Sequence, residues 1–390
     1  MQAIQVESNS FQFAPQVLAW AIDRTGLSID TLAKRVGTSI QNVEAWSAGG
    51  NPTICQAEKL ASAAHIPFPL LLLKEIPAVA PSLPDFRTPG SHTLEKASPE
   101  LEDTILHAQN CQDWYREYLL ENGEGRNEFS GCLRSVDSVD EAARNLLALF
   151  PTLEFERKKA NSTGAFLSAL VRLTERDQGV CVMRGGVAKF NTKRPLDASE
   201  FRGFALSDEV APLVFLNTKD SLSGQVFSLV HELVHIARSL SGVSGENVES
   251  SEETYANKVA GRFLIPEESL ACLLSGKDDL LATAENLARR LKVSAWAVLT
   301  RALDLSLITR DEYIELIAEI RRGLANHPKK GGADFYTARA AFLGRNISCA
   351  MVESVRSGSM LYRDMWRLTG ISPSKVGDFA KRLGHPWGGS

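Results

Sequence analysis

The spacing of apolar and polar positions divides the chain into four regions. Over residues 1–76 apolar positions recur at helical spacing in short stretches that are separated by turn residues. Glycines stand where the helices should end, and serine or threonine stands at the N-cap positions. These residues are Gly26, Gly37, Gly49, Ser28, Ser39 and Thr53. The pattern predicts a compact helical module, followed over residues 77–137 by a Pro- and Ser-rich linker and connecting helices.

The third region, residues 138–310, combines helices with short apolar stretches. A helix capped by Ser162 leads into these stretches, which predict a small antiparallel sheet. They are residues 179–183, 186–191, 201–207 and 211–217. The fourth region, residues 311–390, is again helical, with breaks at glycines. The expected fold class is therefore α+β and predominantly α.

The most specific chemical signal is an H-E-x-x-H motif in the apolar helical stretch that follows the last of these strands. His231 and His235 are one helical turn apart, so both rings can direct a nitrogen to one point, as a tetrahedral Zn²⁺ requires. Glu232 projects about 100° away from His231. That position suits a general base beside the metal better than a ligand. The alternative is an ordinary buried helix in which both histidines are core residues.

A catalytic zinc site requires a third protein ligand. Glu253 is the candidate, because it shares the inward face of the next predicted helix with Ala256 and other apolar residues, and an inward carboxylate needs a cation. Two alternatives stay open in the sequence. Ser250 and Glu253 have the spacing of a capping box, and Glu249 or Glu252 is a ligand candidate on the same segment.

Three segments of this region stand in a fixed order: FRGFALSDEVAPLVFLN, FSLVHELVHIA and ETYANKVAGRFLIP. Together they resemble the ImmA/IrrE family of zinc metallopeptidases, over about residues 140 to 310. The resemblance implies a zincin-like (gluzincin-type) domain in which His231, His235 and Glu253 bind one Zn²⁺ per chain and Glu232 is the base. Val234 departs from the family, because many members have glycine or alanine there.

The resemblance also implies a substrate and a surface that binds it. An extended substrate would pair with the edge strand of the sheet, which is expected to be the last predicted strand. Its residues are Val214, Phe215, Leu216 and Asn217. The substrate would be a regulatory protein, such as a repressor or antitoxin-like protein, in stress, mobile-element or toxin–antitoxin regulation. Two residues beside Glu253, Tyr255 and Asn257, are candidates for stabilising the oxyanion or supporting the ligands; packing in the core is the alternative for Tyr255.

In the first region, GLSIDTLAKRVGTSIQNVEAWSAGG resembles the helix-turn-helix of phage-repressor-like (Xre) regulators. The resemblance implies a recognition helix over residues 39–46, on which Ser39, Gln41 and Asn42 are candidates for contacting DNA. This helix has no Arg or Lys, and residues 1–75 contain five basic and six acidic side chains, a net charge of −1. Since DNA-binding modules usually present a basic face, DNA binding and a role in protein docking or homodimer formation both stay open.

The last region has the opposite charge. From Arg321 onward there are twelve Lys and Arg against four Asp and Glu, a net charge of +8 in a chain whose total is −4. A basic segment of this kind can approach nucleic acid or an acidic partner, or it can be a solvated helical surface.

Composition limits the class of protein. The chain has 390 residues, of which 44% are apolar and 23% charged, as expected for a protein of two or three globular domains. Its apolar runs fall short of the roughly 20 residues of a membrane span, and its N-terminus lacks the pattern of a secretory signal. Its six cysteines form no C-x-x-C pair, which argues against a disulfide framework. The expected protein is a cytoplasmic zinc endopeptidase; the alternative is a DNA-binding regulator whose zinc domain does not cleave.

Overall fold

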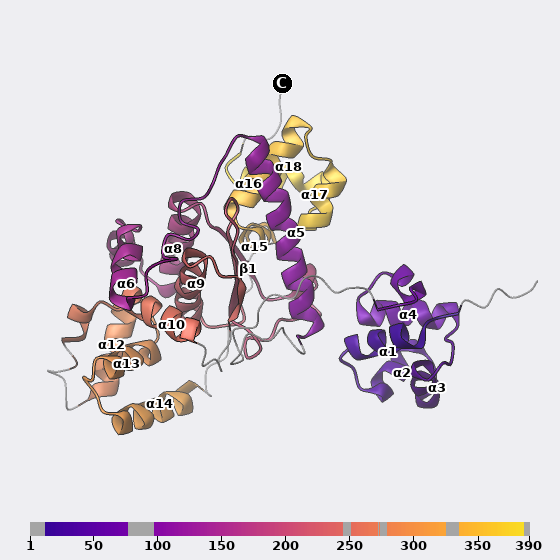
Figure 1. Cartoon of the computed structure of the whole chain (residues 1–390), viewed down its shortest axis with the longest axis horizontal. Helices are drawn as coiled ribbons and strands as arrows, with labels where there is room; N and C mark the ends of the chain where they lie inside the picture. The colour runs from indigo at the N-terminus through magenta and orange to yellow at the C-terminus, as the bar shows by residue number, and fades with distance from the viewer. Residues whose placement is uncertain are drawn as a thin grey trace, which may run out of the picture. The chain divides into compact units, whose positions relative to one another are not determined.

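A computed structural model of the chain describes residues 12–76, 97–244, 251–271, 273, 279–324 and 335–385. The chain forms two compact units (Figure 1). Among the described residues, the first unit contains 12–76 and 97–103, and the second contains the described residues from Thr104 onward. The two units are described separately below.

The first unit is helical, as the sequence predicts. Its elements are α1 (Pro15–Arg24), α2 (Ile29–Val36), α3 (Ile40–Ser47), α4 (Ile54–Ala64) and the 3₁₀ turn η1 (Phe68–Leu72). The predicted caps are present, because the side chains of Ser28, Ser39 and Thr53 each accept a hydrogen bond from a backbone amide of the helix that follows. The turn between α2 and α3 begins at Gly37, whose φ of 80° suits glycine.

The second unit is built around a mixed sheet of strands β1 (Cys181–Gly185), β2 (Gly203–Leu206), β3 (Leu213–Asn217) and β4 (Gly242–Ser244). The spatial order is β1-β3-β2-β4, with β1 parallel to β3 and the other two pairs antiparallel. The α+β class is confirmed, but the prediction of an antiparallel sheet was wrong. The chain between β1 and β3 returns to the same end of the sheet, so these two strands run in the same direction.

The prediction that β3 is an edge strand, open to an extended substrate, was also wrong. β3 lies between β1 and β2, so both of its hydrogen-bonding edges are already paired. All five of its residues are buried, which is the burial of a strand covered on both faces. The strands at the two edges of the described sheet are β1 and β4. β4 was not predicted, because a strand of three residues is too short to show a period.

One of the four predicted strands, residues 186–191, is absent from the sheet. The stretch 186–191 forms a 3₁₀ turn, η2 (Ala188–Phe190), instead. Lys189 and Phe190 have positive φ angles of 43° and 64°, which a strand does not allow. Within this stretch Val187 makes an isolated bridge to Pro195.

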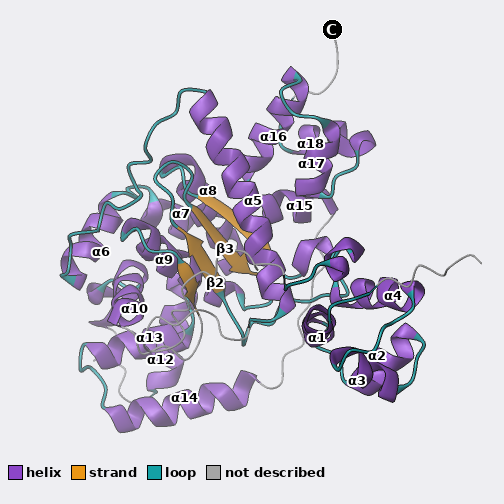
Figure 2. Cartoon of the chain, turned by 45° about the vertical axis from the view of Figure 1, so that its right-hand side comes forward, coloured by secondary structure: helices purple, strands orange, loops and turns teal. Residues whose placement is uncertain are grey.

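Helices cover both faces of the sheet (Figure 2). On one face, α8 (Thr163–Asp177) and α9 (Leu222–Ala237) pack against Val182, Val214 and Leu216. On the other face, the rings of Phe204 and Phe215 stack with their centroids 5.0 Å apart. This alternation of side chains follows from the pleat of the strands.

The remaining helices extend these two layers. Next to α9 lies α10 (Ser251–Leu264), and α10 packs in turn against α6 (Val139–Ala148). The other helices on this side of the unit are α7 (Leu153–Lys159), α12 (Leu280–Leu291), α13 (Ala295–Asp304) and α14 (Arg310–Leu324). The long helix α5 (Pro99–Glu121) also contacts the sheet, because the side-chain amide of Gln112 donates hydrogen bonds to the carbonyl oxygens of Leu206 and Ala211.

The basic C-terminal region is part of the second unit. It forms α15 (Phe335–Leu343), α16 (Arg345–Ser357), α17 (Tyr362–Thr369), the 3₁₀ turn η4 (Pro373–Lys375) and α18 (Val376–Arg382). α15 and α16 contact β1, and the ring of Phe342 lies 6.1 Å from that of Phe215. Among the described residues, no helix is long and apolar enough to cross a membrane.

Candidate metal centre

The H-E-x-x-H motif lies in the C-terminal half of α9, a helix that is mostly buried from Gln225 to Ala237. The helix begins at Ser221, whose hydroxyl accepts a hydrogen bond from the Gly224 amide at 3.0 Å. The helix packs against both the sheet and α10, and the apolar residues around the motif belong to the core. His231 and His235 face the same point, and their Nε2 atoms are 3.0 Å apart. The geometry expected for positions one turn apart is therefore present.

Glu253 reaches this point from α10. Its Oε2 lies 3.0 Å from Nε2 of His231, and its Oε1 lies 3.0 Å from Nε2 of His235. The Glu253 residue is 1% exposed. It contacts both imidazoles, so it is directed at the histidine pair, as the metal-ligand interpretation requires.

Of the two competing carboxylates, Glu252 is the one that the structure describes, and it has another partner. Glu252 forms an ion pair with Arg238, with its Oε1 3.1 Å from a guanidinium nitrogen. Glu249 and the capping-box residue Ser250 lie outside the described residues. Of the described carboxylates, Glu253 is the one that joins His231 and His235 in a group able to hold a metal ion.

Asn257 fixes the orientation of one imidazole. Its Oδ1 lies 3.0 Å from Nδ1 of His231, so the ring donates its Nδ1–H to the amide oxygen. In a neutral imidazole this leaves the lone pair on Nε2, the nitrogen that faces Glu253 and His235. Metal-binding histidines are commonly held in this way by a hydrogen bond to the second ring nitrogen.

The charges at the centre are strongly coupled. Burial raises the pKa of Glu253, but the charge and hydrogen bonds of His231 and His235 outweigh it and hold that pKa at about 2. Burial lowers the pKa of His231, and the neighbouring carboxylate of Glu253 more than reverses the effect, so that the pKa is raised. For His235 burial dominates and the pKa is lowered. The carboxylate therefore stays ionised and requires a positive group beside it.

The three side chains fit a zinc ion. Their ligand atoms all lie within 4.8 Å of one another, and all three residues are buried. Tetrahedral zinc with bonds of about 2.0–2.1 Å separates neighbouring ligand atoms by about 3.3 Å. The observed separations of 3.0 Å are close to that value. Two imidazoles and one carboxylate are a donor set of catalytic zinc sites, in which the fourth position takes water or substrate.

Glu232 lies beside this centre and is wholly buried. Its carboxylate packs against Gly203 at the start of β2, where an added Cβ would lie 3.0 Å from Glu232 Oε1 and 3.0 Å from the carbonyl oxygen of Phe215. Glycine at position 203 therefore makes room for the Glu232 side chain. This residue was not singled out from the sequence, although a glycine inside an apolar strand is a signal of close approach by another group.

Tyr255, one of the candidates for stabilising the oxyanion, contacts Val136 and Arg238. Its hydroxyl donates a hydrogen bond of 2.6 Å to the carbonyl oxygen of Val136, and its ring lies 4.9 Å from the guanidinium carbon of Arg238. The hydroxyl joins α10 to the loop before α6, which favours the packing alternative, and an oxyanion role for Tyr255 stays a prediction.

In the first unit, the three candidate DNA-contacting residues lie at the start of α3. Ser39 caps the helix and Asn42 donates a side-chain hydrogen bond of 2.9 Å to the hydroxyl of Thr38. Gln41 is exposed. These contacts leave Gln41 as the most available of the three side chains for an external partner.

Comparison with known proteins assigns two segments of the chain. Residues 176–303 match the model of the peptidase M78 family, described as the IrrE N-terminal-like domain. This match contains the four strands, α9 and α10, and it confirms the resemblance to the ImmA/IrrE family for this segment. Residues 343–382 match a family described as a domain of unknown function, DUF8813. No curated protein and no solved structure matches the chain.

Proposed function

From the match of residues 176–303 to the IrrE N-terminal-like domain, we propose that the chain is a zinc-dependent endopeptidase that cleaves a regulatory protein. A metallopeptidase-like domain is established by that match. The observation that carries the proposal is the meeting of His231, His235 and Glu253 at one buried point, with Glu232 on the same helix as the histidines.

Each side chain of the centre has a separate task in the proposed reaction. His231, His235 and Glu253 would hold the ion, which when bound would supply Lewis-acid polarisation of the scissile carbonyl and of water. Glu232 accepts a proton from the water that attacks the carbonyl carbon. It then returns this proton to the amide nitrogen as the peptide bond breaks, so that an amine and a carboxylic acid are released, and the acid passes its proton to the amine to give ammonium and carboxylate.

Two further residues position this machinery. Asn257 holds the His231 ring through Nδ1, which keeps the Nε2 lone pair directed at the ion. Gly203 provides the space in which the Glu232 carboxylate lies. Neither is proposed to contact substrate.

β4 is the proposed binding edge for an extended substrate. It lies at the edge of the sheet and pairs with β2, where Ser244 is the partner of Gly203. Gly203 contacts Glu232, and a peptide added along β4 would lie two strand spacings, about 10 Å, from Gly203. This edge replaces β3, whose two sides are already paired.

Burial at the centre sets a condition on the reaction. His231, Glu232, His235 and Glu253 are each between 0% and 4% exposed. The proposed peptidase therefore has to open before a peptide reaches Glu232, which fits an enzyme that acts on one regulatory protein in response to a signal. We place this reaction in the cytoplasm, where a repressor or antitoxin-like substrate would act.

The test compares metal content with cleavage in the full-length chain. Wild-type protein purified without chelators should contain about one zinc per chain by elemental analysis. His231→Ala should lose the metal. Glu232→Gln should keep it and fail to cleave a mixed-sequence fluorogenic peptide library that the wild-type protein cleaves.

Glu253→Gln tests the third ligand, and Glu252→Gln on the same helix is its matched control. Loss of a ligand should weaken zinc binding by at least about 10 to 100-fold, the effect of losing a supporting residue, whereas the control should bind zinc as the wild type does. The assignment of the centre is wrong if wild-type protein contains no transition metal and takes none up.

A second candidate function is supported by the first unit. We propose as the alternative that the chain is a DNA-binding transcriptional regulator whose metal domain senses without cleaving. Its support is the short turn at Gly37 between α2 and α3 and the exposed polar surface of α3. Fluorescence anisotropy with duplex DNA from the region upstream of its own coding sequence would distinguish the two. Binding that weakens steeply with salt, together with no cleavage by zinc-loaded protein, would favour the regulator.

A further inference from the structure

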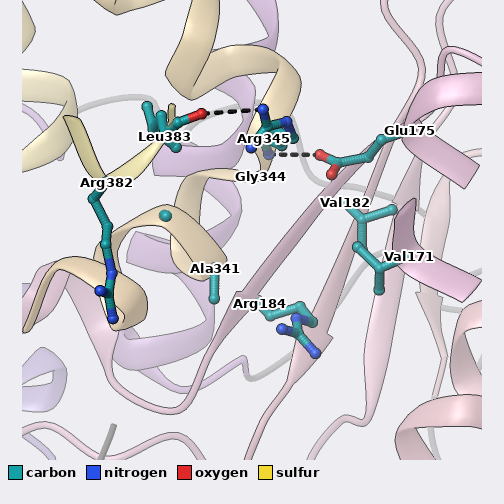
Figure 3. Close-up of a pocket in the computed structure, with 10 residues that line it drawn as sticks. Val171, Glu175, Val182, Arg184, Ala341, Gly344, Arg345, Arg382 and Leu383 are labelled. Carbon is teal, nitrogen blue, oxygen red and sulfur yellow. Dashed lines mark hydrogen bonds between the residues drawn. The ribbon is translucent and has the colours of Figure 1, made fainter. Parts of the chain in front are cut away.

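A cavity of about 290 Å³ lies away from the metal centre, between the sheet and the C-terminal helices (Figure 3). One wall comes from α8 and β1, and the other comes from α15, α16 and α18. Its lining residues come from the two segments that match known families, or from residues next to them in the sequence. One segment is the IrrE N-terminal-like domain and the other is the domain of unknown function.

The lining of the cavity is rich in arginine. Arg184 comes from β1, and Arg345 and Arg382 come from the ends of α16 and α18. These two are part of the basic C-terminal region. Against the three guanidinium groups stands one carboxylate, that of Glu175 at the end of α8. The cavity therefore has an excess of positive charge.

Of these charged groups, the guanidinium of Arg184 has the fewest hydrogen-bond and ion-pair partners. Burial lowers its pKa, and the charge of Glu175 offsets this effect in part. Within the described part of the chain its guanidinium makes no hydrogen bond and no ion pair within 4.0 Å. A half-buried guanidinium with five donors and no acceptor is unfavourable until an anion or water supplies one.

Glu175 can offset the charge of only one of the three arginines, and its carboxylate is also hydrogen-bonded to a backbone amide. Its Oε1 accepts a hydrogen bond of 2.8 Å from the backbone amide of Arg345, the first residue of α16. The N-cap of that helix is Gly344, whose φ is 77° and where an added Cβ would lie 2.6 Å from the same Oε1. Glu175 thus caps α16 from another element, and it faces the positive end of that helix.

The rest of the lining sets the size and character of a ligand. Val171, Val182 and Ala341 supply an apolar surface between the charged groups. The volume is at the lower end of the roughly 300–1,000 Å³ of small-molecule sites. A compact organic anion fits these conditions better than a nucleotide or a peptide.

We propose that this cavity binds a small organic oxyanion, a phosphorylated or polycarboxylate metabolite, whose anionic group is held by Arg184, Arg345 and Arg382. Phosphate and carboxylate both present pairs of anionic oxygens that can accept two parallel hydrogen bonds from a planar guanidinium group. The bound ligand would link the peptidase-like segment to the C-terminal helices. This proposal is independent of whether the metal centre cleaves peptides.

Isothermal titration of the full-length chain tests the site, with 3-phosphoglycerate, citrate and inorganic phosphate as probes and potassium chloride to match ionic strength. Saturable binding of 3-phosphoglycerate or of citrate is expected, and comparison of the two identifies phosphate or carboxylate as the preferred group. Arg184→Met should weaken the binding by about tenfold or more, since it removes charge-assisted hydrogen bonds.

Arg363→Met is the control, because Arg363 is an exposed arginine of α17 that does not line the cavity. It should bind the probes as the wild type does. Arg382→Met provides a second variant whose exposed side chain can be removed without disturbing the core, in case Arg184→Met does not fold. Absence of saturable binding up to about 10 mM, which corresponds to a negligible affinity, overturns the proposal, as does equal binding by the cavity variants and the control.

Discussion

Replacement of Glu175 by glutamine tests how burial at the end of α8 affects the stability of the second unit. The side chain is buried, and burial raises its pKa from 4.5 to about 7, although hydrogen bonds from the backbone of Arg345, Asn346 and Val182 and the charge of Arg184 act in the opposite direction. Glutamine keeps the shape and an oxygen that can accept the Arg345 amide hydrogen bond, but it cannot titrate.

The sign of the effect follows from proton binding. Between about pH 4.5 and pH 7 the folded chain holds a proton on Glu175 that the unfolded chain has lost, so the free energy of unfolding decreases as the pH rises. The contribution is fully present below the unfolded pKa and is lost as the pH rises through the folded one. A difference of about 2.5 in pKa corresponds to about 3 kcal/mol in total, of which about 2.5 kcal/mol is lost between about pH 5 and pH 8.

Differential scanning calorimetry of wild-type and Glu175→Gln chains, both zinc-loaded, measures this loss. The transition of the second unit should gain stability in the variant relative to wild type as the pH rises, by about 5 °C in Tm between about pH 5 and pH 8. Other titrating groups are common to both chains and cancel in the difference. Equal pH dependence of the two Tm values, or a carbon-13 NMR titration of the Glu175 carboxyl with a midpoint near its ordinary pKa, would refute the reasoning.

Two further predictions concern the metal centre. Asn257→Ala should weaken zinc binding by about 10 to 100-fold, because the His231 ring loses the acceptor for its Nδ1–H. Competition with a chelator measures the zinc affinity, with the exposed-surface variant Lys258→Ala as the control. Equal affinity in the two variants would contradict the prediction. Gly203→Ala should lower the cleavage rate by up to about 100-fold with zinc content unchanged, because a Cβ at position 203 displaces the Glu232 carboxylate. A wild-type cleavage rate in this variant would show that the carboxylate does not need the space beside Gly203.

The sequence by itself determined the local features of the protein. The helices α2, α3 and α4 begin as their N-caps predict, because Ser28, Ser39 and Thr53 act through hydrogen bonds from amides three residues away. The two histidines of α9 face one point because the spacing of an α-helix requires it. These features depend on the geometry of a single element, so a pattern in the residues is enough to predict them.

Tertiary structure decided every feature that joins two elements. Glu253 was one of several carboxylates in the sequence, and only the packing of α10 on α9 brings its two oxygens to His231 and His235. The central place of β3, the parallel pairing with β1 and the space for Glu232 beside Gly203 also come from contacts between distant segments. The cavity between Arg184 and the C-terminal helices is of the same kind. The periodicity of apolar residues shows which face of a helix or strand is buried, but not which other element that face packs against. The packing partner depends on how all the apolar faces of the chain can be buried together.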